Sequence, residues 1–453
     1  MRNAFQLALA LGLAAGVSLA GQTDPRTEIT KWQDGREAAV AITYDDSTIN
    51  QFRVALPMMN ERGLVGTFFV ITAQIPGSTH MPMFVGRPIM EIVRESATVL
   101  TSAANVYERT SMLRYLAEIQ RNEIALASRT QPANLASVDT ALAKLRESGQ
   151  TLAAGAVPYV PVRSEEAQSG RPRADEPGGL SWDEMRKVAA QGHEIASHSI
   201  SHARMTVLDE ANILYEVEKA RDELREKMGE KHTFSLESPF GIRDEHSRRV
   251  LISRFDLVRN WVHDMDAEYM DGYMRGNNTD PAASTKPYLE WERGPVSATT
   301  IDQMKGWVDK SLQTGAWLVL VIHGVNGLGY EPLATDNVRA YFDYMKAKVD
   351  SGQLWVATYQ DGVKYVRERM RSEIKTEPAG AGIRVTVTHP LDPRKYDVPL
   401  TARTTVPAGW TSARVTQGGV SATVAVHPHA GGPYVQYRVK PNGGPVSLTR
   451  VNE

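Results

Sequence analysis

Apolar, strand-like segments alternate with helical segments along most of this chain, and this alternation limits the fold more than any other feature. A strand at 38–44 is followed by a helix at 51–62 and a second strand at 65–70. A strand, a helix and a strand with this spacing predict a parallel pair. Similar units recur over 181–371 and would close into a β/α barrel.

The alternation is interrupted once and then replaced. Residues 76–179 carry helical patterns without a strong strand, so we expect a helical insertion lying over the barrel mouth, within a barrel domain at 28–375. Residues 376–382, rich in Gly and Ala, are expected to form a linker. Short alternating segments separated by Pro and Gly then predict a small antiparallel β-sandwich at 383–453. A chain of 453 residues is long enough for two domains.

The N-terminus has the pattern of an export signal. Arg2 precedes an almost wholly apolar run, and small residues stand at Ser18 and Ala20. We therefore expect a signal peptide at 1–20 and a secreted or periplasmic location, although an uncleaved membrane anchor is the alternative. The apolar run is short for a stable span. The chain has no cysteine, which excludes disulfides.

The overall charge excludes some partners. The formal net charge is -2, and no long basic run occurs. We therefore expect no binding to nucleic acid and no binding to a membrane once the signal is cleaved. The composition leaves the oligomeric state open.

Four polar residues stand where predicted strands end, namely Asp45, Asp46, His198 and His323, and His202 follows four residues after His198. Each has an ordinary structural explanation alone, such as a turn aspartate or a core histidine. In a β/α barrel, however, these strand ends meet at one mouth. Asp46, His198 and His202 could hold a divalent metal and leave a position open for water, as in a catalytic zinc site. We expect Zn²⁺, although Co²⁺, Ni²⁺ or Mn²⁺ would accept the same ligands. Asp45 could then accept a proton from the water, and His323 could protonate the leaving group.

At these residues the chain resembles the polysaccharide deacetylases of carbohydrate esterase family four, which share the NodB homology domain. Residues 43–46 resemble the first family motif, in which the first Asp is the base and the second a metal ligand. Residues 198–202 match the second, metal-binding motif, and 320–323 resemble the last motif, whose His is the acid. The resemblance implies a distorted β/α barrel that hydrolyses N- or O-acetyl groups of an acetylated polysaccharide or oligosaccharide.

The chain also departs from the family pattern. Ser47 stands where the first motif has Gly, and Glu237 stands where the third motif has Arg. Phe240 still matches, so the resemblance implies that its backbone N–H stabilises the oxyanion. The family Arg orients the catalytic Asp, and Arg243 or Arg259 could take its place. We expect Glu237, if close, to raise the pKa of Asp45.

Two other functions are compatible with the sequence. Glu237 and Ser47 favour a carbohydrate-binding barrel that has lost catalysis. A metal-dependent amidase acting on a small amide would use the same core chemistry, and the long insertion would suit a closed pocket. Acetate release from acetylated glycans separates these readings from a carbohydrate deacetylase.

Overall fold

The computed structural model describes residues 24–126, 134–157, 180–241, 244–259, 267–270 and 279–451. The predicted signal peptide at 1–20 lies outside these residues. The chain folds as two compact units. In the described ranges, one comprises Thr30–Arg371 with His389–Leu400, and the other comprises 24–29, Ser372–Thr388 and 401–451. Among the helices in the described ranges, none has the length and apolar character needed to cross a bilayer.

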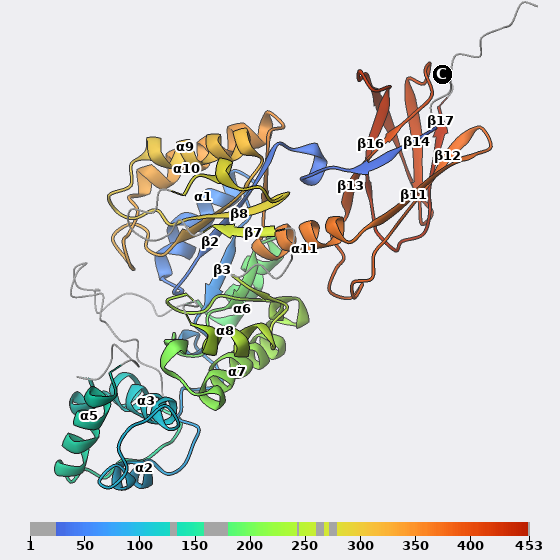
Figure 1. The fold of residues 1–453 in the computed structure, drawn as a ribbon. Helices are drawn as coiled ribbons and strands as arrows, with labels where there is room; N and C mark the ends of the chain where they lie inside the picture. Colours follow the sequence, from blue (N-terminus) through green and yellow to red (C-terminus); the bar gives the residue numbers. More distant parts are fainter. Residues whose placement is uncertain are drawn as a thin grey trace, which may run out of the picture. The chain divides into compact units, whose positions relative to one another are not determined.

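The larger unit is built on a parallel sheet (Figure 1). Its central strand β2 (Ala38–Tyr44) is entirely buried and pairs along its length with β9 (Trp317–Ile322). The sheet order is β6-β5-β4-β3-β2-β9-β8-β7, and β10 also pairs with β2. The other strands are β3 (Thr67–Val70), β4 (Glu194–Ser197), β5 (Ser235–Leu236), β6 (Leu257–Val258), β7 (Ala267–Met270), β8 (Tyr288–Arg293) and β10 (Leu354–Ala357). The predicted β/α barrel is confirmed.

The barrel is distorted, as expected. Strands β5 and β6 have only two residues each. Strand β10 pairs with the first half of β2, from Ala38 to Ala41, whereas β3 pairs with Thr43 and Tyr44 at its end. Two strands therefore share one edge of β2, and the carboxyl end of β2 lies next to β3 and β9.

Helices cover this sheet, and several of them begin at side-chain N-terminal caps. Helix α6 (Trp182–Ala190) starts at a capping box formed by Ser181 and Glu184, and α7 (Glu210–Met228) starts at Asp209. The other helices of the barrel are α1 (Leu56–Glu61), α8 (Glu245–Ile252), α9 (Ile301–Thr314), α10 (Thr335–Asp350) and α11 (Tyr359–Met370).

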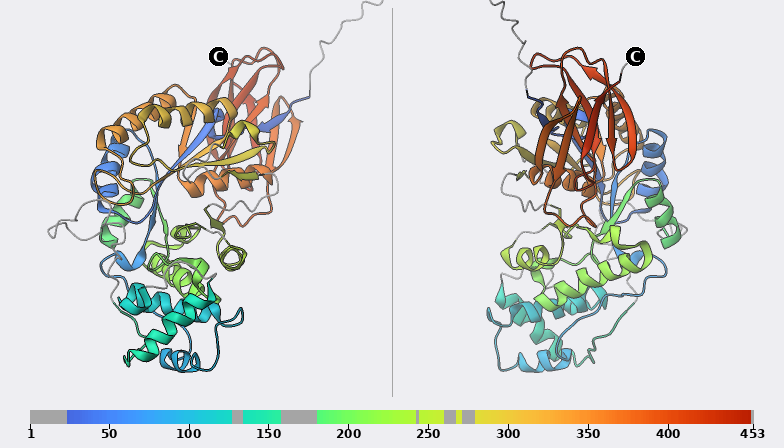
Figure 2. Two further views of the ribbon diagram at one scale, coloured as in Figure 1. Left: turned by 60° about the vertical axis from the view of Figure 1, so that its left-hand side comes forward. Right: turned by 90° about the vertical axis from the view of Figure 1, so that its right-hand side faces the viewer.

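The described part of the insertion is helical, as predicted. It contains α2 (Ile89–Glu95), α3 (Val106–Arg114), α4 (Glu123–Leu126) and α5 (Leu135–Glu147), with a π-helical turn at Tyr115–Ile119 after α3. These helices bury a core of their own that includes Ile92, Met112, Leu116 and Leu142. Figure 2 shows them gathered beside α7 in both views.

The smaller unit is an antiparallel β domain, and this part of the prediction is also confirmed. Its strand order is β1-β13-β16-β15-β14-β17-β12-β11. The strands are β1 (Thr27–Ile29), β11 (Glu373–Ala379), β12 (Gly382–Thr388), β13 (Leu400–Thr405), β14 (Ser412–Gln417), β15 (Val420–His427), β16 (Tyr434–Val439) and β17 (Val446–Arg450). On β12, Ile383, Val385 and Val387 point into the core and alternate with more exposed residues.

The linker predicted at 376–382 is wrong. Most of it belongs to the edge strand β11, which forms a hairpin with β12 through a turn at Gly380, where φ is 60°. Strand β11 is largely exposed and contains Pro378. An exposed edge strand lacks the apolar alternation that identifies a half-buried strand, and proline is tolerated at an edge.

Candidate metal and catalytic site

The carboxyl ends of three barrel strands bring the predicted site residues together. Asp45 and Asp46 follow β2, His198 follows β4, and His323 follows β9. The N–H of Asp45 still donates to the carbonyl of Ile322, at 3.0 Å, so the pairing of β2 with β9 continues to the first acidic residue. Parallel strands deliver these side chains to one edge of the sheet.

Asp46, His198 and His202 form a compact cluster whose ligand atoms all lie within 4.8 Å of one another. Oδ1 of Asp46 lies 3.1 Å from Nε2 of His202 and 3.5 Å from Nε2 of His198. Burial raises the pKa of Asp46, but the neighbouring imidazoles outweigh it and hold this pKa well below the ordinary value. The Asp46 carboxylate is therefore ionised at neutral pH.

The tautomer of His198 indicates which kind of ligand the cluster of Asp46, His198 and His202 can bind. Nδ1 of His198 lies 2.9 Å from the carbonyl oxygen of Glu237 and donates to it. In the neutral ring, the lone pair of Nε2 then faces the carboxylate. Oδ1 of Asp46 is buried and accepts no hydrogen bond from the described residues. A lone pair directed at a buried anionic oxygen is unfavourable unless the ring is protonated or a cation lies between them, and this donor set fits a divalent metal.

The loops at this edge have a strained backbone. Positive φ angles occur at Asp46 (72°), Ser47 (58°), Ser199 (66°), His202 (56°) and Phe240 (62°). Residues other than Gly adopt this region at a cost, and such positions cluster at functional sites. Ser47, which replaces the family Gly, adopts the left-handed conformation and accepts a 2.9 Å hydrogen bond on Oγ from the N–H of Ile71. The Ser47 side chain thus adds a hydrogen bond at a backbone conformation that favours Gly.

Arg259, directly after β6, holds the predicted base. Its Nη1 and Nη2 donate to the two carboxylate oxygens of Asp45 at 2.8 and 2.5 Å, and Nη1 also donates to Oγ1 of Thr43 at 2.8 Å. Its Nε lies 3.0 Å from Oε2 of Glu237. Asp45, Glu237 and Arg259 are each at most 3% exposed. Arg259 therefore lies between the two carboxyl groups and forms a fork with the base.

The expectation that Glu237 raises the pKa of Asp45 is wrong. Burial does raise the pKa of Asp45, but the charge and hydrogen bonds of Arg259 outweigh burial and hold this pKa below its ordinary value. Burial raises the pKa of Glu237 well above its ordinary value, and Arg259 opposes this only in part. Glu237 is thus the carboxyl group that keeps its proton to higher pH, and Asp45 is the ionised partner of Arg259. Arg243, the other candidate, lies outside the described residues.

His323 lies close to Asp45 and approaches the carboxylate oxygen that Nη2 of Arg259 also bonds. Its Nε2 is 3.8 Å from Oδ2 of Asp45, and its ring meets the ring of Tyr330 edge-on at 5.5 Å between centroids. The imidazole is 17% exposed, so it is accessible from the mouth. A carboxylate and an imidazole at this distance have the chemistry of a general base and a general acid.

Phe240 lies at the rim of the cluster. Its ring packs against the ring of His202, at 4.7 Å between centroids, and the guanidinium of Arg204 lies 4.0 Å from its centroid. Phe240 is nevertheless 43% exposed. The role of its backbone N–H as an oxyanion donor stays a prediction. No sequence motif pointed to Arg204 or Tyr330, because only the folded chain brings these two residues to the site.

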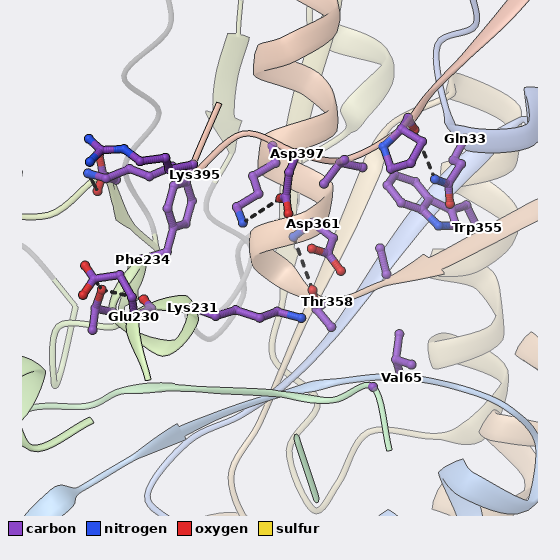
Figure 3. Close-up of a pocket in the computed structure, with 18 of the residues that line it drawn as sticks. Gln33, Val65, Glu230, Lys231, Phe234, Trp355, Thr358, Asp361, Lys395 and Asp397 are labelled. Carbon is purple, nitrogen blue, oxygen red and sulfur yellow. Dashed lines mark hydrogen bonds and ion pairs between the residues drawn. The ribbon is translucent and has the colours of Figure 1, made fainter. Parts of the chain in front are cut away.

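A separate cavity of about 490 Å³ lies in the same unit but away from this cluster (Figure 3). Val65 and Gly192, which line it, precede β3 and β4, whereas the metal cluster follows the ends of β2 and β4. Its charged lining includes ion pairs, such as Lys395 Nζ with Asp256 Oδ2 at 2.7 Å. The cavity shares no residue with the predicted site.

Solved structures with similar chains include two family 4 carbohydrate esterases. The esterase from Streptomyces lividans, in complex with acetate, is 13% identical, with a TM-score of 0.30 over 71% of this chain and 92% of that one. The acetyl xylan esterase from Clostridium thermocellum, in complex with a cobalt ion, is 12% identical, with a TM-score of 0.32 over 72% of this chain and 91% of that one. A peptidoglycan deacetylase from Bacillus subtilis is 13% identical, with a TM-score of 0.31 over 76% of this chain and 95% of that one.

Two comparisons concern the sequence itself. A gellan lyase from Bacillus sp is 25% identical over 279 residues, which are 59% of this chain but only 11% of that protein. The sequence model of the polysaccharide deacetylases matches residues 162–253. This segment contains His198, His202 and Phe240. Over this segment, the chain is similar to the polysaccharide deacetylases.

Proposed function

We propose that this protein is a metal-dependent deacetylase that hydrolyses N- or O-acetyl groups of a carbohydrate. One observation carries the proposal. The buried Oδ1 of Asp46 faces Nε2 of both His198 and His202, while the base Asp45 lies next to it in the chain. The match of residues 162–253 to the polysaccharide deacetylase model supports an acetylated polysaccharide or oligosaccharide as the substrate.

Each residue has a distinct part in the proposed reaction. Asp46, His198 and His202 would hold a divalent cation, with Zn²⁺ expected first and Co²⁺, Ni²⁺ or Mn²⁺ as alternatives. Such a cation polarises the acetyl carbonyl and acidifies a water molecule. Asp45, whose two carboxylate oxygens are both bonded by Arg259, would accept the proton of that water.

Protonation of the leaving group completes the proposed reaction. His323, 3.8 Å from Asp45, donates a proton to the leaving nitrogen or oxygen of the sugar. The N–H of Phe240 would stabilise the oxyanion that forms on the acetyl group. The products are acetate and a sugar with a free amine or hydroxyl group.

Arg259 weakens the case for a barrel that has lost catalysis. Glu237 favoured that reading because it removes the family Arg. Arg259 occupies the position beside Asp45 instead and makes the fork that the base requires. A secreted or periplasmic location remains part of the proposal and rests on the sequence pattern at 1–20.

Acetate release tests the proposal. Metal-stripped protein is incubated with N-acetylated chitin-type oligomers, O-acetylated xylan and small amides, with and without Zn²⁺ or Co²⁺. We expect acetate from a glycan only when metal is restored, and none from Asp45→Asn. Turnover of small amides alone would favour the amidase. Glycan binding without acetate release under every metal would favour a non-catalytic barrel.

A further inference from the structure

The insertion contacts the metal-binding loop through one buried arginine. Arg114, the last residue of α3, is 8% exposed. Its Nη2 donates to Oγ of Ser201 at 2.7 Å and to the carbonyl oxygen of Ser201 at 3.3 Å. Ser201 lies between the two predicted histidine ligands and directly precedes His202.

Glu216 of α7 holds the same serine from the other side. Its Oε2 accepts a hydrogen bond from the N–H of Ser201 at 2.9 Å, and its Oε1 accepts one from Oγ of Ser201 at 2.5 Å. Nη1 of Arg114 closes the network with a 3.2 Å contact to Oε1 of Glu216. The N–H, the carbonyl and the hydroxyl of Ser201 are therefore all bound by two side chains from outside the loop.

The loop needs such support because its backbone is strained. Ser199 and His202 have φ angles of 66° and 56°. Left-handed conformations of this kind persist only where the surroundings fix them. Ser201 itself is 3% exposed, whereas the imidazole of His202 is 21% exposed and has less packing of its own. The network at Ser201 thus fixes the backbone directly before His202.

The insertion is anchored well enough to carry this contact. The side-chain amide of Asn212 on α7 bonds the N–H and carbonyl of Val85, at 2.9 and 2.8 Å. The carboxylate of Glu223 accepts hydrogen bonds from the N–H groups of Thr79 and His80. Oγ1 of Thr110 on α3 donates to the carbonyl of Val207 at 2.6 Å. The insertion is therefore fixed along α7 and after the metal-binding loop.

We propose that the insertion acts as a clamp on the metal-binding loop, with Arg114 as the positioning residue for His202. This inference rests on the metal site of the proposed function. Loss of a residue that bonds a metal ligand directly typically changes metal affinity by about 10- to 100-fold, and we expect the same order for Arg114, which fixes the residue next to His202. The insertion then contributes to metal affinity, apart from any effect it has on access to the mouth.

The chain offers a matched control on the same helix. Arg109 is fully buried, but it bonds Thr101, Asp139 and the carbonyl of Val99, all within the insertion. Arg109→Met therefore disturbs the insertion without touching Ser201. Arg114→Met removes a buried arginine of the same kind and breaks the clamp.

Cobalt titration followed by visible absorption gives the dissociation constant of Co²⁺ and reports its ligand geometry. Urea unfolding of the metal-free variants reports stability separately. We expect Arg114→Met to weaken Co²⁺ binding about 10- to 100-fold and to alter the spectrum. Arg109→Met should keep the wild-type constant and spectrum despite its loss of stability. Arg114→Lys should fall between, because one ammonium cannot bond Ser201 and Glu216 as a fork does.

The outcomes separate the clamp from the metal site. If wild-type protein fails to bind Co²⁺, the proposed function itself is wrong. If wild type binds and Arg114→Met binds equally well, the clamp is wrong, and equal weakening by Arg109→Met would also overturn it. Should Arg114→Met not fold, Ser201→Ala carries the test, since it removes the hydroxyl to which both Arg114 and Glu216 are bonded. An unchanged constant for Ser201→Ala would then overturn the clamp.

Discussion

Replacing Arg259 by Met tests the arrangement around the base most sharply. The variant keeps a side chain of similar length but removes the charge that separates Asp45 from Glu237. Both carboxyl groups remain buried, at 3% exposure each. Asp45 would lose both bonds of its fork and would have to ionise without its arginine.

The size of the effect follows from these contacts. Each of the two bonds to the Asp45 carboxylate is worth about 1.5–3 kcal/mol, as is usual for charged partners. Their sum of about 3–6 kcal/mol agrees with the loss of about 3–5 kcal/mol found when one partner of a buried ion pair is removed. We expect the free energy of unfolding of Arg259→Met to fall by that amount. Misplacement of the base should also lower kcat by about 10²-fold.

Urea unfolding and steady-state acetate release measure the two effects. Glu237→Gln is the control, because it keeps the fork between Arg259 and Asp45 and replaces a carboxyl group that already favours its protonated form. It should cost about 1 kcal/mol or less. The reasoning is refuted if Arg259→Met matches wild type in stability and kcat, or if Glu237→Gln is as damaging as Arg259→Met.

Three further predictions concern the core, the pH dependence and the β domain. Leu318 is fully buried in β9, so Leu318→Ala should lower the free energy of unfolding in urea by about 2–5 kcal/mol; an unchanged value would contradict the packing. Burial raises the pKa of Glu290 from 4.5 to about 7, so the native state holds a proton that the unfolded chain releases between these pH values. Wild-type stability should therefore fall by about 3 kcal/mol as pH rises from 4.5 to 7, whereas Glu290→Gln should lack this fall when urea curves at pH 5 and 8 are compared. The hydroxyl of Tyr437 is buried and lies 2.7 Å from Oγ1 of Thr404, so Tyr437→Phe should destabilise the β domain by about 1 kcal/mol in thermal unfolding, and full stability would show that this bond is not needed.

The parts of the fold and site that could be predicted are those with a local signal. Asp45, Asp46, His198 and His323 each follow an apolar strand, and the parallel topology implied by the strand–helix alternation places such ends together. The structure brings these residues together with His202 at one edge of the sheet. Here the sequence carries both the periodicity of the strand and the chemistry at its end.

The parts that could not be predicted depend on contacts between distant segments. The charge of Glu237 alone indicated a damaged site, because nothing local shows that Arg259 on the next strand lies between Glu237 and Asp45. Arg114 likewise reads as an ordinary helix residue until folding places it against Ser201. Strand β11 escaped detection because an exposed edge strand has no apolar face to reveal it.

The metal content of the purified protein tests the central claim most directly. Wild type, Asp46→Ala and His198→Ala are dialysed against buffer containing trace Zn²⁺, and bound metal is measured by mass spectrometry alongside protein concentration. Three protein ligands with an open position predict one divalent ion per wild-type chain and none in either variant. A wild-type protein that retains no metal, or variants that retain a full equivalent, would contradict the account.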